Sequence, residues 1–329
     1  MKKITESLSF VIPCYRSEHT IPSVIEEIKN WVDSHDVKEW EIIAVNDCSP
    51  DGVQEVLEKI ASDNQKIKVI ELAKNMGKHA AMLAGYSKVS GTLIVNLDDD
   101  GQCPVDQLDL LLDEIERGAD IALAKYRVKK QSVFKRFGSL MNQKMAQIMI
   151  GQPKDIQISN FSVIRRIIVE EMIKYQNPYP YVSGLMLRST KHIVNVQMDE
   201  RERLYGSTNY TFIKSIKLWL NGFTAFSVIP LRIATMAGMC CTAIGVVSGL
   251  YVVIKRLLNP AIPAGYSSLM AALLFIGGMI MLMLGMIGEY IGRIYISINN
   301  SPQYVIRQTI NIEKSERQSK MTEGSAGGE

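Results

Sequence analysis

The chain has 329 residues, a length that accommodates one catalytic domain of ordinary size together with a smaller segment. Its formal net charge of +3 is too small for the basic surface of a nucleic-acid-binding domain, which excludes nucleic acid as a partner. The five cysteines are an odd number without metal-ligand spacing, and we expect them to be reduced thiols.

The N-terminal part of the chain alternates between two hydrophobic patterns. Short apolar runs typical of buried strands lie at residues 8–13, 41–45, 67–72, 93–97 and 121–124. Segments with helical periodicity separate these runs, near residues 21–32, 52–60, 77–89 and 105–117. This order predicts an α/β domain over residues 1–208, with a Rossmann-like, mostly parallel sheet that has helices on both faces. Such a sheet binds its ligand beyond the carboxyl ends of its strands.

Polar residues directly follow three of the predicted strands. They are residues 13–16 after the first strand, residues 46–51 after the second and residues 98–102 after the fourth. Neither a G-x-G-x-x-G sequence nor a G-x-x-x-x-G-K-[ST] sequence occurs in the chain. The sequence therefore argues against dinucleotide-dependent oxidoreductases and P-loop nucleotidases.

Three consecutive carboxylates, Asp98, Asp99 and Asp100, follow the fourth strand. Like charges this close repel one another unless a cation or solvent relieves them, and Mg²⁺ or Mn²⁺ commonly binds one or two carboxylates together with substrate phosphates. Alternate side chains of an extended segment share one side, so we expect Asp98 and Asp100 to bind the metal and Asp99 to point away. A solvated turn that caps the following helix is the alternative interpretation.

The segment at residues 209–230 spaces aromatic and aliphatic side chains near helical periodicity, with Lys214 and Lys217 between them. This pattern predicts an interfacial helix on a membrane surface, or alternatively an amphipathic helix packed on the globular domain. Residues 294–329 are expected to form a cytoplasmic tail, and the end of this tail is expected to be disordered because it is rich in serine, glycine and charge.

Two long uncharged stretches lie between these segments, at residues 233–254 and 267–288. Each is long enough to cross a bilayer as a helix, which predicts a two-helix transmembrane hairpin over residues 231–293. Two core helices of a soluble protein are the alternative. The basic residues that flank the hairpin outnumber Lys255 and Arg256 in its loop, so the catalytic domain is expected on the cytoplasmic side of a bacterial inner membrane.

Four segments together resemble glycosyltransferase family 2, whose catalytic domain has the GT-A fold. They are Phe10 to Tyr15 (FVIPCY), Ile43 to Asp51 (IAVNDCSPD), Asn75 to Gly85 (NMGKHAAMLAG) and Leu97 to Pro104 (LDDDGQCP). Two later segments, Arg203 to Tyr210 (RLYGSTNY) and Gly288 to Tyr295 (GEYIGRIY), resemble the polyprenyl-phosphate glycosyltransferases. These include the dolichol-phosphate mannosyltransferase-like enzymes and, most similar, the undecaprenyl-phosphate aminoarabinose transferase type. The resemblance covers nearly the whole chain.

The resemblance implies a nucleotide-binding role for four residues. Pro13, Tyr15 and Asp47 would line the pocket for the base and ribose. Asp47 would accept a hydrogen bond from uracil if the donor is a UDP-sugar, and Lys78 would assist at the nucleotide.

The resemblance also implies a metal and diphosphate site. Asp98 and Asp100 would hold Mg²⁺ or Mn²⁺ and the diphosphate, with Gln102 completing the metal's ligands. Arg203 would neutralise phosphate, so Asp98, Asp100 and Arg203 are the expected catalytic residues. Relatives assemble through the hairpin, which implies a homo-oligomer.

The chain departs from the family pattern at three polar positions. Arg16 and Ser17 follow Tyr15 where relatives have Asn-Glu, and Asn209 stands where a lysine is expected. Asn160 occupies the place of an aspartate that is often proposed as catalytic.

The loss of that carboxylate favours one class of acceptor. A phosphomonoester is largely dianionic at pH 7 and can attack without a general base, whereas a sugar hydroxyl would need one. We therefore expect an inverting displacement that transfers the sugar to a polyprenyl phosphate, undecaprenyl phosphate in bacteria, for cell-envelope glycan or lipid modification.

Two other functions fit part of the pattern. A processive polysaccharide synthase is disfavoured because the chain lacks a Q-x-x-R-W sequence and has only two predicted spans. A non-catalytic nucleotide-sugar-binding membrane protein is suggested by the three substituted polar positions.

Overall fold

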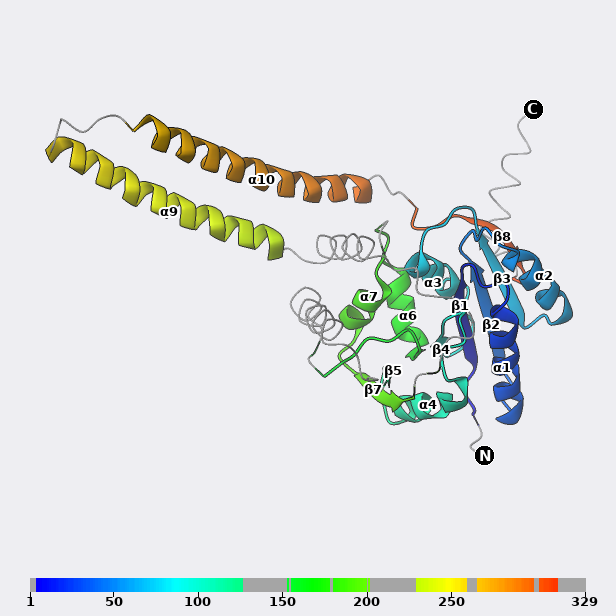
Figure 1. Cartoon of the computed structure of the whole chain (residues 1–329). Helices are drawn as coiled ribbons and strands as arrows, with labels where there is room; N and C mark the ends of the chain where they lie inside the picture. Colours follow the sequence, from blue (N-terminus) through cyan, green and yellow to red (C-terminus); the bar gives the residue numbers. More distant parts are fainter. Residues whose placement is uncertain are drawn as a thin grey trace, which may run out of the picture. The chain divides into compact units, whose positions relative to one another are not determined.

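The computed structural model describes residues 4–126, 153, 155–177, 180–199, 201, 229–258, 265–298 and 302–312 (Figure 1). The chain divides into two compact units, Met1–Asn209 with Pro302–Glu329, and Tyr210–Ser301. Nearly all of the predicted interfacial helix, and the predicted disordered end of the tail, lie outside the described residues.

The first unit begins with strands and helices in alternation, close to the ranges that the apolar periodicity predicts. The strands are β1 (Leu8–Cys14), β2 (Trp40–Asn46), β3 (Ile67–Leu72), β4 (Leu93–Asn96) and β5 (Ile121–Tyr126). The helices between them are α1 (Ile21–Ser34), α2 (Val53–Asp63), α3 (Lys78–Tyr86) and α4 (Leu108–Glu116), the last preceded by the 3₁₀ helix η1 (Val105–Gln107).

Further elements complete one sheet from the described residues. They are β6 (Ser162–Arg165), α6 (Arg166–Ile173), α7 (Val182–Ser189), β7 (Ile193–Met198) and β8 (Ile306–Ile310). The strand order is β7-β5-β6-β4-β1-β2-β3-β8. β1 pairs in parallel with β2 and β4, as β2 does with β3 and β5 with β7, whereas β6 and β8 are antiparallel to their neighbours. The prediction of a mostly parallel Rossmann-like sheet is thus confirmed.

Alternate residues of the central strands pack on opposite faces of this sheet. Phe10 and Ile12 of β1 belong to a core shared with α1, α2 and α4, whereas Val11 packs with α3, α6 and α7. All three side chains are fully buried. α3 lies so close to β1 that a Cβ on Gly85 would come within 2.6 Å of Val11 Cγ1. Helices therefore cover both faces, as the sequence predicts.

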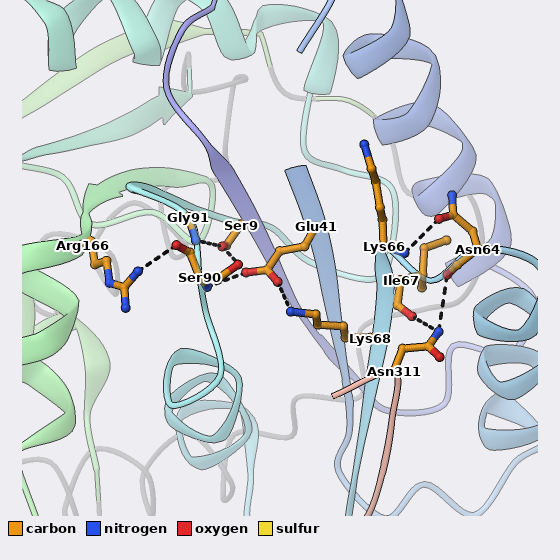
Figure 2. Close-up of polar contacts among 10 residues, drawn as sticks. All are labelled: Ser9, Glu41, Asn64, Lys66, Ile67, Lys68, Ser90, Gly91, Arg166 and Asn311. Carbon is orange, nitrogen blue, oxygen red and sulfur yellow. Dashed lines mark hydrogen bonds and ion pairs between the residues drawn. The ribbon is translucent and has the colours of Figure 1, made fainter. Parts of the chain in front are cut away.

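A buried ionic network joins the amino ends of the strands (Figure 2). Glu41 is 4% exposed and pairs with Lys68, while it accepts hydrogen bonds from Ser9 Oγ at 2.5 Å and from Ser90 N–H at 2.6 Å. Gly91 N–H donates to Ser9 Oγ at 2.9 Å. Burial by itself would raise the pKa of Glu41, but Lys68 and the hydrogen-bond donors together lower this pKa below its ordinary value.

The chain that follows the second long helix returns to the sheet and adds β8 beside β3. Ala73 N–H donates to Val305 O at 2.8 Å, next to the β3–β8 ladder. Asn311 has a positive φ of 57° and donates through Nδ2 to Ile67 O at 2.9 Å (Figure 2). The same Nδ2 also donates to Ala61 O at 2.8 Å. The sequence pattern of this tail does not predict a strand, so β8 is a finding of the structure.

The second unit contains two long helices, α9 (Ile229–Leu258) and α10 (Tyr266–Ile298). Within them, Ala234–Tyr251 and Phe275–Gly292 have mean hydropathies of 1.5 and 1.6 and are long enough to cross a membrane. These stretches are 8% and 0% buried within the described structure, whereas the core helices of a soluble protein are mostly buried. The helices therefore present apolar side chains outward.

We expect Glu41→Gln to lower the free energy of unfolding at pH 7 by roughly 3 kcal/mol, because Lys68 loses its partner in a largely buried site. The pKa of Glu41 is lowered in the fold, so the stabilisation is complete above about pH 4.3 and is lost as the pH falls further. Thermal melts of the full chain in detergent, from neutral to acidic pH, measure this difference. Equal stability of the two proteins at pH 7 would contradict the prediction.

Two substitutions at Asn311 separate its hydrogen bonds from its backbone conformation. Asn311→Gly keeps the positive φ and should cost about 1 kcal/mol for the lost hydrogen bonds. Asn311→Ala should cost about 1–2 kcal/mol more, because a Cβ is strained in the left-handed region. Hydrogen exchange of the β3 and β8 amides reports the difference, and a smaller effect of alanine than of glycine would refute the assignment.

Candidate functional site

A cavity of about 370 Å³ lies where β1, β2 and β4 end. It is lined by Pro13, Cys14, Tyr15, Asp47, Asn75, Gly77, Lys78, Asp98, Asp99 and Asp100. Eight residues are expected from the sequence to bind the nucleotide or metal or to act in catalysis, and six of them line this cavity. The two exceptions are Gln102, which lies just beyond the acidic triplet, and Arg203, which lies outside the described residues.

Asp47 fixes the loop between β3 and α3. Its Oδ1 accepts a hydrogen bond from Met76 N–H at 2.7 Å, and its Oδ2 accepts one from Gly77 N–H at 2.8 Å. Asn75 Nδ2 donates to the Asp47 backbone oxygen at 3.2 Å. Burial raises the pKa of Asp47, although the two N–H donors oppose this effect. Each carboxylate oxygen has two lone pairs, so Asp47 can hold the loop and still accept from a ligand.

Gly77 has a backbone conformation, φ 86° and ψ 159°, that essentially only glycine adopts. It precedes Lys78, the first residue of α3. Since Asp47 holds the Gly77 N–H, this conformation directs the start of α3 toward the cavity that Lys78 lines.

Both carboxylate oxygens of Asp98 are engaged by side chains from other elements. Lys78 Nζ pairs with Oδ1, and Asn160 Nδ2 donates to Oδ2 at 2.9 Å. Asn160 precedes β6, and β6 pairs with β4, the strand that leads to Asp98. From the sequence, Asn160 is only the replacement of an expected carboxylate, whereas in the structure it is a hydrogen-bond donor to Asp98.

Asp99 also lines the cavity, and the direction of its side chain relative to those of Asp98 and Asp100 stays a prediction. β4 ends at Asn96, and the acidic triplet follows it. Asp99 Oδ2 accepts a hydrogen bond from Tyr15 N–H at 2.9 Å, which joins the ends of β4 and β1. Burial, with a further contribution from the charges of Asp98 and Asp100, raises the pKa of Asp99 to about 6.

The third carboxylate connects to the residues that follow it. Asp100 Oδ1 accepts a hydrogen bond from Gln102 N–H at 3.2 Å, and Gln102 Nε2 donates to Arg201 O at 3.4 Å. The Arg201 guanidinium forms ion pairs with Glu27 and Asp106, each at 2.5 Å. These contacts anchor residue 201 beside the acidic turn. No sequence motif points to Arg201, whose contacts depend on the folded chain.

The residues at the cavity fit a divalent ion that binds together with a phosphate ligand. Asp98 and Asp100 supply two carboxylates, and Mg²⁺ or Mn²⁺ commonly adds substrate phosphate oxygens to such a pair. Among the described residues, no group of three or more His, Cys, Asp or Glu side chains could hold a metal alone. Burial raises the pKa of the Cys14 thiol well above its ordinary value.

Comparison with known proteins identifies relatives of both units. The model of Glycosyl transferase family 2 matches residues 9–173, and that of the GtrB C-terminal hairpin matches residues 229–294. The chain is 30% identical over 313 residues to the undecaprenyl-phosphate 4-deoxy-4-formamido-L-arabinose transferase of Proteus mirabilis, covering 93% of this chain and 95% of the relative. It is 29% identical over 312 residues to the SfII prophage-derived bactoprenol glucosyl transferase of Shigella flexneri, covering 92% and 98%.

A solved structure shares the fold of the first unit. Glucosyl-3-phosphoglycerate synthase from Mycobacterium tuberculosis, in complex with Mn²⁺, uridine diphosphate and glucosyl-3-phosphoglycerate, superimposes with a TM-score of 0.51. The sequences are 18% identical, and the match covers 67% of this chain and 78% of that protein. The similarity confirms the GT-A fold predicted from the sequence.

We expect Gly77→Ala to weaken the binding of uridine diphosphate, because a Cβ would force the loop out of the conformation that Asp47 holds. The strain should also cost about 1–3 kcal/mol of stability. Gly118→Ala is the matched control, since Gly118 also has a positive φ, of 105°, but does not line the cavity. Calorimetry of both variants tests this prediction, which fails if both lose the same affinity.

Proposed function

Because this chain belongs to glycosyltransferase family 2, we propose that it transfers a sugar from a UDP-sugar to a polyprenyl phosphate, with inversion at the anomeric carbon. The acceptor in this proposal is undecaprenyl phosphate, and the product serves cell-envelope glycan or lipid modification. The single observation that carries the proposal is the cavity in which Lys78, Asp98 and Asp100 meet at the carboxyl ends of the strands.

The nucleoside of the donor would occupy the side of the cavity formed by Pro13, Tyr15 and Asp47. Asp47 is 3% exposed and rigidly bonded to the loop at Met76 and Gly77, which suits a carboxylate that must recognise one base. Tyr15 is 44% exposed, so its ring is available to a flat partner at the mouth of the cavity. These contacts support a nucleotide ligand.

The diphosphate would lie against Asp98 and Asp100 with a bound Mg²⁺ or Mn²⁺, and Gln102 would contribute to the same group. When bound, this ion would stabilise the negative charge that develops on the departing nucleoside diphosphate. Lys78 at the cavity wall, and Arg203, supply further positive charge to the leaving group. Asp98, Asp100 and Arg203 are thus the proposed catalytic residues.

The proposed acceptor rests on the chemistry of Asn160 and on the second unit. Asn160 contacts Asp98 at the position of the missing carboxylate, and an amide cannot take up a proton as a general base. A phosphate dianion attacks without such a base. The outward-facing apolar stretches of α9 and α10 suit a bilayer, where a polyprenyl phosphate resides.

We place the enzyme at the bacterial inner membrane with both helices crossing the bilayer. Basic residues on the flanks of the helix pair outnumber those in its loop, which supports a cytoplasmic catalytic domain. The names of the relatives in Proteus and Shigella, which refer to undecaprenyl phosphate and bactoprenol, favour this function over a processive polysaccharide synthase.

The purified full chain, supplied with labelled UDP-sugars, undecaprenyl phosphate and Mn²⁺, should form a labelled glycolipid. Asp100→Ala should slow this reaction by about 10²–10³-fold, because it removes electrostatic stabilisation of the leaving group. Asp33→Ala removes an exposed carboxylate of α1 that does not line the cavity and should leave the rate unchanged.

Three results would count against the proposal. A full rate with Asp100→Ala would refute the metal assignment. Binding of UDP-sugars without turnover on any lipid phosphate would favour the non-catalytic alternative. A long polymeric product would favour a processive synthase.

A further inference from the structure

We propose that Lys78 is a resident counter-ion that holds Asp98 while the donor is absent and transfers to the donor's diphosphate when a metal ion binds. Asn160 is the positioning residue that keeps Asp98 in place throughout this exchange. The inference deepens the proposed function and rests on it for the identity of the ligand. It starts from the two contacts of the Asp98 carboxylate: Lys78 Nζ pairs with Oδ1, and Asn160 Nδ2 donates a hydrogen bond to Oδ2.

Asp98 needs a counter-ion because it belongs to a run of three carboxylates. Carboxylates at adjacent positions repel one another unless a cation or hydrogen-bond donors relieve the repulsion. Lys78 places a positive charge on this run without any bound ligand. The Lys78 and Asp98 side chains are 35% and 23% exposed, so the pair is open to the cavity and can be exchanged.

The two partners of Asp98 differ in how firmly they are attached. The backbone of Lys78 is fixed, because it follows Gly77, whose N–H is bonded to Asp47. Its ammonium is carried on a flexible four-carbon stem and can move within the cavity while the backbone stays in place. Lys78 can therefore release Asp98 without any change in α3.

Asn160 has a short side chain on an anchored backbone. The next residue, Phe161, is fully buried, and Ser162 begins β6 and accepts a hydrogen bond from Asn96 Nδ2 at 2.9 Å. Asn160 is neutral, so its hydrogen bond to Asp98 Oδ2 does not repel a cation that binds at Oδ1. This contact can persist when the charge of Lys78 is replaced.

Lys78 and a divalent ion are alternatives at Asp98, because both are cations and both need the same carboxylate. If Lys78 moved away from Asp98 and found no other anion, its ammonium group would lose its ion-pair partner. The diphosphate of a nucleotide-sugar supplies a new partner in the same cavity, since Lys78 and the carboxylates line it together. The exchange breaks and forms only ion pairs and hydrogen bonds, and no covalent bond changes.

The exchange predicts that substitutions of the two partners of Asp98 have opposite effects on the affinity for Mn²⁺. With Mn²⁺ alone, Lys78→Met should bind the ion about two- to fivefold more tightly than the wild type, the range expected for a partly exposed ion pair. Asn160→Ala should bind Mn²⁺ more weakly by a similar factor, because Asp98 is then less well oriented. The free Mn²⁺ signal in electron paramagnetic resonance, measured on the full chain in detergent, gives both affinities.

Lys74→Met is the matched control, because Lys74 is an exposed lysine in the same loop and does not line the cavity. It removes the same charge and should leave the Mn²⁺ affinity unchanged. If Lys78→Met does not fold, as judged by its thermal melt, Lys78→Gln removes the charge while it keeps a hydrogen-bond donor. This variant should also bind Mn²⁺ more tightly.

A second measurement uses uridine diphosphate in the presence of Mn²⁺. Lys78→Met should bind it about two- to fivefold more weakly, because the diphosphate loses its new partner. Weaker or unchanged Mn²⁺ binding by Lys78→Met, no Mn²⁺ binding by either protein, or unchanged affinity for uridine diphosphate would overturn the inference.

These outcomes are distinguishable from a failure of the proposed function. If the wild type makes glycolipid but the signs of the Mn²⁺ effects are wrong, only the role of Lys78 and Asn160 is refuted. If the signs are as expected but no glycolipid forms with any UDP-sugar, the transfer reaction is refuted, while the exchange holds for a nucleotide-binding protein.

Discussion

The mutual repulsion of Asp98, Asp99 and Asp100 is the constraint around which the cavity is arranged. Lys78 and Asn160 contact Asp98 and the Tyr15 N–H contacts Asp99, all from distant parts of the chain, while the nearby Gln102 N–H donates to Asp100. These contacts stabilise the run of negative charge and hold the ends of β1, β4 and β6 and the start of α3 in register around it. Adjacent carboxylates of this kind are well suited to receive a cation and a phosphate.

The carboxylates at the two ends of the sheet have different surroundings. At the amino ends, Glu41 is enclosed by Lys68 and by donors from Ser9 and Ser90, and this closed network stabilises the fold (Figure 2). At the carboxyl ends, Asp98 and Asp100 face a cavity, so part of their hydrogen-bonding capacity remains directed toward a ligand. The carboxylate at the amino ends is thus enclosed, whereas those at the carboxyl ends line a cavity.

The two long helices are an insertion in the sequence of the catalytic domain, because the chain after α10 adds β8 to the sheet. The β3–β8 ladder and the hydrogen bonds of Asn311 fasten the returning segment, and Ala73, which bonds to Val305, begins the loop that Asp47 holds. The domain is therefore joined covalently to the helix pair on both sides. A catalytic domain with two such connections is restrained more strongly near a membrane than one with a single connection.

The sequence by itself determined the alternation of strands and helices, because hydrophobic periodicity is a local property and the central strands are continuous apolar runs. It also placed most of the cavity residues, since the carboxyl ends of parallel strands meet at one edge. Only the tertiary structure decided the contacts that depend on distant pairing. Asn160 reaches Asp98 because β6 pairs with β4, and β8 exists because the edge of β3 accepts a short strand that buries little surface alone. Asp99 accepts the Tyr15 N–H beyond the end of β4, and the end of a strand depends on its neighbours as much as on its own residues.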